Sequence, residues 1–184
     1  RKMKTDSSVL CSSTFSRILA EAAVDVLGQS DVDNLALSAE GDISVEAFME
    51  SLQKHYGPTG SRGVAQRIGK AAFKYFLDCY GSELNLTTLD YRLLPNRKRV
   101  KTGLETVSRK LGEEFGTKIL LDSDDGAYYW RITDMDGAGD FAFLLAGMAQ
   151  ELMSWSGGGR VYSVRGMTDA NECVLKMDRK PLEF

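Results

Sequence analysis

Histidine and cysteine, which supply most catalytic bases and metal ligands, are scarce in this chain. Its 184 residues include one histidine, His55, and three widely separated cysteines, Cys11, Cys79 and Cys173, without a CxxC spacing. This pattern predicts neither a disulfide framework nor a zinc site, so we expect reduced thiols. Nothing in the sequence supplies a catalytic partner for His55, which is expected to be an ordinary residue near a helix end. We therefore predict no catalytic residue, and the sequence does not indicate an enzyme.

Long apolar runs and an excess of positive charge are also missing. No run approaches the roughly 20 apolar residues needed to span a bilayer. The start of the chain, RKMKTDSSVLCSS, lacks the apolar core of a secretory signal. The net charge of −3 gives no overall attraction to nucleic acid. We expect a cytoplasmic protein that neither spans a membrane nor binds nucleic acid.

The residues that are plentiful indicate one folded unit. Hydrophobic residues make up 43% of the chain and charged residues 27%, and there are only 3 prolines. A chain of this length and composition can bury a core without disulfides or metals. We expect residues 1–13 to be a flexible, polar segment and residues 14–184 to form a single ligand-binding domain.

Apolar residues at helical spacing dominate the first part of the chain. They predict helices from Thr14 to Gly28, over VEAFMESLQKHY after a capping Ser44, from about Ser61 to Tyr80, and from Val100 to Phe115. The glycine-rich GPTGSRG is expected to form a turn before the third helix. The polar segment 29–42 and the one containing LLPNRKRVK are expected to be connections.

The pattern then changes to that of strands. The segment TKILLDSDDGAYYWRITD predicts a hairpin with its turn at SDDG, and GDFAFLLAGMAQELMSWSGGG predicts a buried helix. RVYSVRG and ECVLKMD predict two more strands, with a turn at about Met167 to Asn171. This order indicates an α+β domain with a mainly antiparallel sheet and helices packed on one face.

Two loops superficially resemble ligand-binding motifs. Gly57, Gly60 and Gly63 precede a helix, but their spacing is not that of a dinucleotide fingerprint, so we interpret them as a tight turn. Because Arg62 and Arg67 lie close to this turn in the sequence, binding of an anion at the start of the helix is the alternative. The run DMDGAGD lacks the bidentate glutamate of a calcium loop, so we interpret it as a solvated loop.

The basic residues Arg92, Arg97, Lys98, Arg99 and Lys101 form a short group. We interpret this group as a solvated helix start, with a docking patch as the alternative.

Large apolar side chains on helices that should face one another are the candidate ligand contacts. Such a set is usually core, although it can line a cavity. The candidates are Ile68, Phe73, Phe76, Leu77, Leu104, Val107, Leu111, Tyr129, Trp130, Phe143, Leu144, Met148 and Trp155.

Three parts of the chain together resemble the 4-vinyl reductase (hydrocarbon-binding) domain family. They are HYGPTGSRGVAQRIGKAAFKYFLDCYG, RLLPNRKRVKTGLETV, and GMAQELMSWSGGGRVYSVRG with the ending ECVLKMDRKPLE, and the resemblance covers about residues 45–184. It implies an α+β fold shared with transport-particle subunits, often dimeric, with a buried apolar pocket. It also implies binding of hydrophobic or tetrapyrrole-related molecules.

The resemblance also raises the question of a metal, because sensors of that family carry a structural zinc held largely by cysteines. This chain does not have the full set of those cysteines. Only Cys173 falls on a family cysteine, while the other positions are Arg165 and about Ala142. A single thiolate cannot complete a tetrahedral zinc site, so we predict no metal, and no cofactor is expected.

The leading expectation is a homodimeric carrier or sensor that binds a hydrocarbon, aromatic or tetrapyrrole-like ligand without catalysis. One alternative is a tetrapyrrole vinyl-reductase accessory or subunit that needs a partner, since the chain has no dinucleotide or flavin motif. The other alternative is a ligand-free interaction scaffold.

Overall fold

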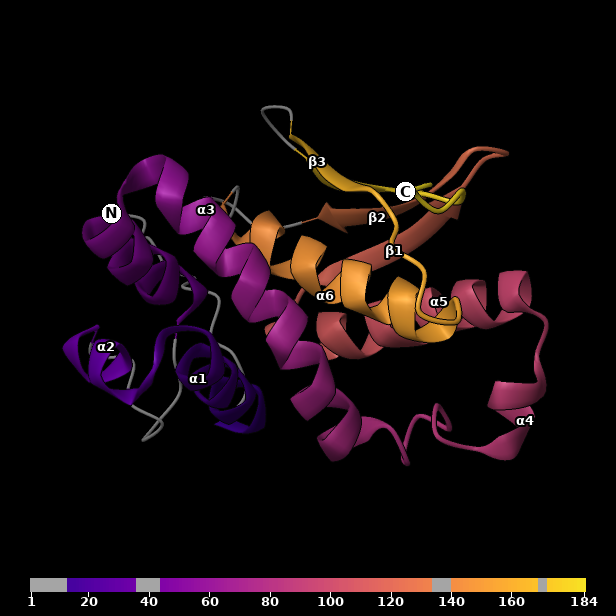
Figure 1. Cartoon of the computed structure of the whole chain (residues 1–184), viewed down its shortest axis with the longest axis horizontal. Coiled ribbons are helices and arrows are strands. Elements are labelled where there is room, and N and C mark those ends of the chain that lie inside the picture. The colour runs from indigo at the N-terminus through magenta and orange to yellow at the C-terminus, as the bar shows by residue number, and fades with distance from the viewer. Residues whose placement is uncertain (1–12, 36–43, 134–139, 169–171) are drawn as a thin grey trace, which may run out of the picture.

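The computed structural model describes residues 13–35, 44–133, 140–168 and 172–184, which form six helices and one sheet (Figure 1). The helices are α1 (Ser13–Leu27), α2 (Gln29–Asn34), α3 (Val45–Tyr80), α4 (Leu89–Leu93), α5 (Asn96–Phe115) and α6 (Phe141–Ser156). The strands are β1 (Lys118–Ser123), β2 (Ala127–Thr133), β3 (Val164–Thr168) and β4 (Cys173–Asp178). The predicted α+β class is confirmed.

The sheet is antiparallel throughout, with the strand order β1-β2-β4-β3. β1 and β2 form the predicted hairpin, and the Asp124 carboxylate fixes its turn by accepting hydrogen bonds from the N–H groups of Gly126 and Ala127. Trp130 and the opposite Leu175 are fully buried on the face of the sheet that the helices cover. Tyr129 and Arg131 of β2 point to the other face and are only half-buried. The helices therefore cover one face, and β1 and β3 are the two edges.

The helices are arranged in layers beneath the sheet. α6 lies against β3 and β4, α3 packs on α6, and α1 packs on the far side of α3 (Figure 1). A Cβ atom on Gly69 would overlap the carbonyl oxygen of Leu144, and one on Gly147 would overlap that of Gln66. The backbones of α3 and α6 therefore touch, which is possible only because both contact positions lack a side chain.

A kink at Gly57 joins what the sequence predicts as two separate helices. α3 continues through this residue, whose φ of 78° and ψ of 172° interrupt the helical geometry. Ser44 caps the helix as predicted, since its hydroxyl accepts from the N–H of Ala47. The second half begins at Pro58, which suits a first helical position because it has no N–H to satisfy. The expected glycine-rich turn before Ser61 is therefore a single residue long.

Several other boundaries differ from the sequence prediction. The short helices α2 and α4 lie in segments predicted as connections, and α5 begins at Asn96 rather than Val100. The third strand begins at Val164 rather than Arg160. Four segments lie outside the described residues: residues 1–12, residues 36–43, residues 134–139 of the predicted solvated loop DMDGAGD, and residues 169–171 of the predicted last turn.

One continuous apolar core links the helices to the sheet. Phe115 connects three helices, because its ring centroid lies 4.7 Å from that of Phe15 on α1 and 4.9 Å from that of Phe141 on α6. Trp130 ties the sheet to α5 through its Nε1–H, which donates to the Leu104 carbonyl at 3.2 Å. Within the part of the chain that the structure describes, no helix is both long and apolar enough to cross a membrane.

Candidate functional site

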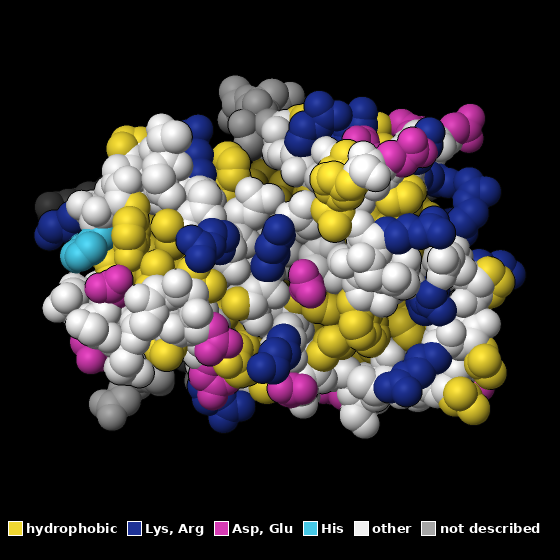
Figure 2. Space-filling model, viewed as in Figure 1, with side chains coloured by type: hydrophobic (Ala, Val, Ile, Leu, Met, Phe, Trp, Pro, Cys, Tyr) yellow, Lys and Arg dark blue, Asp and Glu magenta, His cyan; other side chains and the backbone are white. Residues whose placement is uncertain are grey.

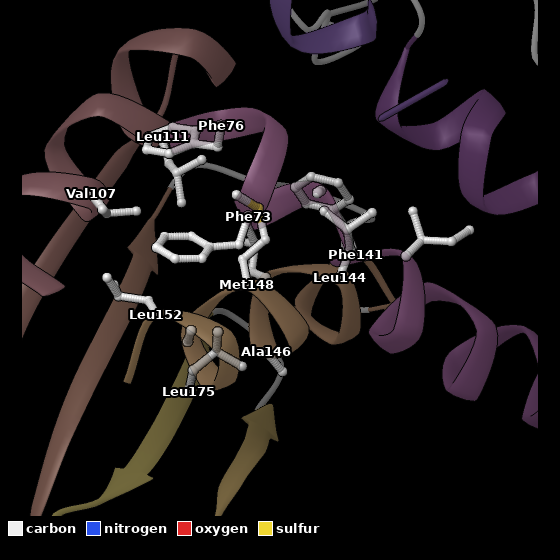
Figure 3. Packing of buried hydrophobic residues seen from close by; sticks show 14 of the residues in the cluster. Phe73, Phe76, Val107, Leu111, Phe141, Leu144, Ala146, Met148, Leu152 and Leu175 are labelled. Atoms are coloured by element: carbon white, nitrogen blue, oxygen red, sulfur yellow. The ribbon is translucent and has the colours of Figure 1, made fainter. Parts of the chain in front are cut away.

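The structure places most of the predicted ligand contacts together in one tightly packed core. Figure 3 shows several of them converging from α3, α5 and α6. Nine have at most 2% of their surface exposed: Ile68, Phe73, Phe76, Leu104, Val107, Leu111, Trp130, Leu144 and Met148. Side chains around an open pocket would be accessible from within it, so these side chains fill the space between them. Their role as ligand contacts stays a prediction, and it requires the core to open.

The other four candidates are less buried than this cluster. Three of them still touch the core, since the ring centroids of Trp155 and Phe73 lie 5.7 Å apart and Leu77 and Phe143 pack against it. Tyr129 is on the outer face of the sheet, where its hydroxyl donates to Asp124 at 2.7 Å. Phe143 lies under the guanidinium of Arg62, 5.3 Å from its ring centroid. Trp155 is 38% exposed, and Leu77 is half-buried. The structure therefore does not unite the whole predicted set at one site.

A groove lies between α5 and β1. It has a volume of about 490 Å³. None of the sequence-predicted contacts lines it. The groove forms where the chain reverses after α5 at Gly116, whose φ of 62° places it in the left-handed region. The glycine at position 112 lets α5 approach the Thr117 carbonyl closely.

The lining of this groove combines charge with an apolar floor. Glu105, Arg109, Glu113 and Lys118 supply charges of both signs, and Ile119 contributes apolar surface from β1. β1 is an edge strand, so its backbone is paired with a neighbouring strand on one side only. The groove can therefore offer a ligand ionic, backbone and apolar contacts together.

The remaining candidate residues have ordinary structural surroundings. His55 lies at the surface of the first half of α3, where Figure 2 shows it in cyan. The Gly57–Gly63 segment is almost entirely helical, and Arg62 pairs with Asp140 at 3.2 Å. Among the described residues, no three His, Cys, Asp or Glu side chains are grouped so that they could hold a metal ion. Cys173 is half-buried, and burial raises the pKa of its thiol to about 11.

The basic group near the start of α5 divides into inward and outward residues. Arg99 turns inward: its Nη1 donates to the carbonyl of Arg92 at 2.8 Å, and its Nε donates to that of Ser156. Arg97 and Lys98 are exposed. The simple interpretation as a solvated helix start therefore does not hold for Arg99.

Comparison with known proteins identifies the fold. No family model matches the chain, and no curated protein matches it. A crystal structure of an oxygen-binding H-NOX domain related to soluble guanylate cyclases matches with a TM-score of 0.56 and 14% identity, over 94% of this chain and 97% of that one. An H-NOX protein from S. oneidensis in the Fe(II) ligation state matches with a TM-score of 0.62 and 10% identity, over 92% and 97%.

The chain has the H-NOX fold. The predicted relationship to the 4-vinyl reductase family is therefore wrong, as is the prediction of a hydrocarbon-binding domain of that kind. The segments that carried the resemblance are amphipathic helices and a hairpin, and different α+β folds use such segments in similar order. Sequence pattern alone could not separate the two folds.

Proposed function

We propose that this chain is a non-catalytic sensor domain that binds a small molecule in the α5–β1 groove, without haem. The groove is the observation that carries the proposal. Its volume of about 490 Å³ lies within the usual range for small-molecule sites. Structural neighbours of the chain include an H-NOX domain in its oxygen complex, so the same fold serves as a small-molecule binder elsewhere.

Haem does not fit the described residues of this chain. Other neighbours with the H-NOX fold were studied for haem redox potential and haem distortion. Protein ligands of haem iron are His, Cys, Met or Tyr side chains beside a slot for the macrocycle. The only histidine, His55, is at the surface, and the side chains between α3, α5 and α6 are fully buried against one another. The touching backbones at Gly69 and Gly147 bring α3 and α6 too close for a porphyrin between them.

The chemistry of the groove favours a small amphipathic ligand with a charged group. Arg109 and Lys118 can pair with an anionic group, and Glu105 and Glu113 can pair with a cationic one. Ile119 and the neighbouring Leu121 provide apolar contact on the opposite wall. A pure hydrocarbon would displace water from these charged groups without giving them a partner, which costs free energy. A purely apolar ligand is therefore disfavoured.

The test is native mass spectrometry of the protein purified from its own source. A stoichiometric bound compound is expected, and Arg109→Glu should lower the retained fraction by about tenfold through loss of a charged hydrogen bond. Arg92→Glu, a charge reversal at another exposed position, on α4, should retain the compound as the wild type does. Bare wild-type protein, or equal retention in both variants, would contradict the groove as the binding site.

A second candidate function is a ligand-free interaction scaffold, which the filled core favours. Exposed apolar side chains on α4, Leu89 and Leu93, are 69% and 72% accessible and could meet a partner. Bare protein in the mass spectrum would favour this candidate. The native mass spectrum also tests the predicted homodimer, because the measured mass distinguishes one chain from two.

A further inference from the structure

A second, smaller cavity collects three arginines at the end of the molecule where α5 begins. It has a volume of about 140 Å³ and lies between the first turn of α5, Tyr128 of β2 and the segments around Arg160 and Arg179. Arg97 from α5 completes the set, and none of the described residues that line the cavity is acidic. In a chain of net charge −3, three positive groups around one space indicate an anion site.

No acidic side chain in the described part of the chain neutralises the three guanidinium groups. The Nε of Arg179 is buried without a hydrogen-bond partner in the described part of the chain. Its guanidinium carbon lies 4.5 Å from the centroid of the Tyr128 ring, which holds the group in place. A buried donor without an acceptor is rare in proteins, and because this Nε is shielded from solvent, only the accessible part of the guanidinium group can meet an anion.

The start of α5 adds a further positive element. The helix is 20 residues long, and Pro95 precedes it without a side-chain cap. The uncapped N–H groups of the first turn and the positive end of the helix dipole favour an anion beside Asn96 and Arg97, which both line the cavity.

Backbone hydrogen bonds hold the two other arginine-bearing segments in fixed positions. The N–H of Leu182 donates to the carbonyl of Val161 at 2.8 Å, next to Arg160. The N–H of Arg179 donates to the carbonyl of Gly126 in the hairpin turn at 3.0 Å. The arginines therefore extend from a preorganised frame, which lowers the entropic cost of binding.

We propose that this cavity binds a phosphate group. The volume of about 140 Å³ equals roughly four to five water molecules, which suits a tetrahedral oxyanion but not a whole nucleotide. The two N–H groups on one edge of a planar guanidinium match a pair of phosphate oxygens. Three arginines also suit the double negative charge of phosphate better than the single charge of a carboxylate. The site is separate from the α5–β1 groove, shares no residue with it, and does not depend on the function proposed for it.

The test is isothermal titration calorimetry with inorganic phosphate and with glycerol 3-phosphate, at constant ionic strength and pH 7.5. Saturable binding with one site per chain is expected. The probe with the higher affinity shows whether the site prefers free phosphate or a phosphomonoester. Arg97→Gln and Arg160→Gln should each weaken binding by about tenfold or more, because each removes a charged hydrogen bond. Both side chains are exposed, so neither change should impair folding.

Lys98→Gln is the matched control. It removes the same charge from the same turn of α5, and Lys98 does not line the cavity. Its affinity for phosphate should stay within about twofold of the wild type, since a distant surface charge contributes little. No saturable phosphate binding by the wild type would overturn the proposal. An equal loss of affinity in Lys98→Gln and Arg97→Gln would also overturn it, because it would show general attraction to a basic surface.

Discussion

At the scale of single residues, the contact between α3 and α6 depends on two glycines. Gly69→Ala and Gly147→Ala should each lower the free energy of unfolding by about 3 kcal/mol or more, because the new methyl group would meet a backbone carbonyl that cannot rotate away. Urea unfolding measures this change.

Gly63→Ala on the same helix is the control for these variants. A Cβ at Gly63 would have open space around it, so the change should stabilise the protein by about 0.5–1 kcal/mol through helix propensity. Similar unfolding free energies for all three variants would show that α3 and α6 do not touch as described.

The two described cysteines should differ in reactivity. Cys79 is exposed, whereas burial of Cys173 raises the pKa of its thiol to about 11. The thiolate is the reactive form, so Cys173 in the folded protein should be alkylated slowly at pH 8 and faster as the pH rises toward 11. Iodoacetamide labelling followed by mass spectrometry, in a Cys11→Ser background, measures both rates. Equal rates at pH 8 would contradict the burial of Cys173.

The raised pKa of Cys173 also sets a direction for stability against pH. The folded state holds the thiol proton more tightly than the unfolded chain, whose cysteine pKa is about 8.5. The contribution of Cys173 to stability is therefore fully present below that value and is lost as the pH rises through about 11. Cys173→Ala should reduce the loss of stability over this range, as urea unfolding at several pH values would show.

At the scale of elements, the kink in α3 depends on Gly57. Its φ of 78° is unfavourable for a residue with a side chain, so Gly57→Ala should destabilise the protein by about 1–2 kcal/mol. Gly60→Ala, three residues later in regular helix, meets only the Cβ of Tyr56 at ordinary contact distance and should be neutral or stabilising. Equal effects in thermal unfolding would contradict the kink.

Elements fixed by local contacts could be predicted from the sequence. Ser44 caps α3 through its own neighbours, and Asp124 closes the hairpin turn within three residues, so both signals are present in short stretches. α2 and α4 could not be predicted in this way. They have 6 and 5 residues, too few for an apolar period to emerge, and the capping hydroxyl of Thr88 at α4 is a weak signal alone.

The candidate sites were harder to predict than the elements. The arginine cavity is assembled from Arg97, Arg160 and Arg179, which lie on three segments that only the tertiary structure brings together. The α5–β1 groove depends on the exact direction of the chain after Gly116. The apolar set around Phe76 was recognisable as inward-facing, but spacing does not tell whether such residues enclose a ligand or only one another.

At the scale of the whole molecule, the chain combines the H-NOX fold with an interior that its own side chains fill. The haem studied in other proteins of this fold has no corresponding space among the described residues, and the surface position of His55 removes the one available imidazole from the core. The candidate binding sites lie instead on both ends of α5. This arrangement is consistent with the proposed haem-free binding of a small molecule.

The most direct test of this account is a haem titration of the purified chain, followed by absorption spectroscopy in the oxidised and reduced states. After gel filtration to remove loosely held haem, no stoichiometric Soret band is expected, and His55→Ala should give the same spectrum as the wild type. A Soret band that corresponds to one haem per chain and survives gel filtration would contradict the account, because the core would then have to open around a porphyrin.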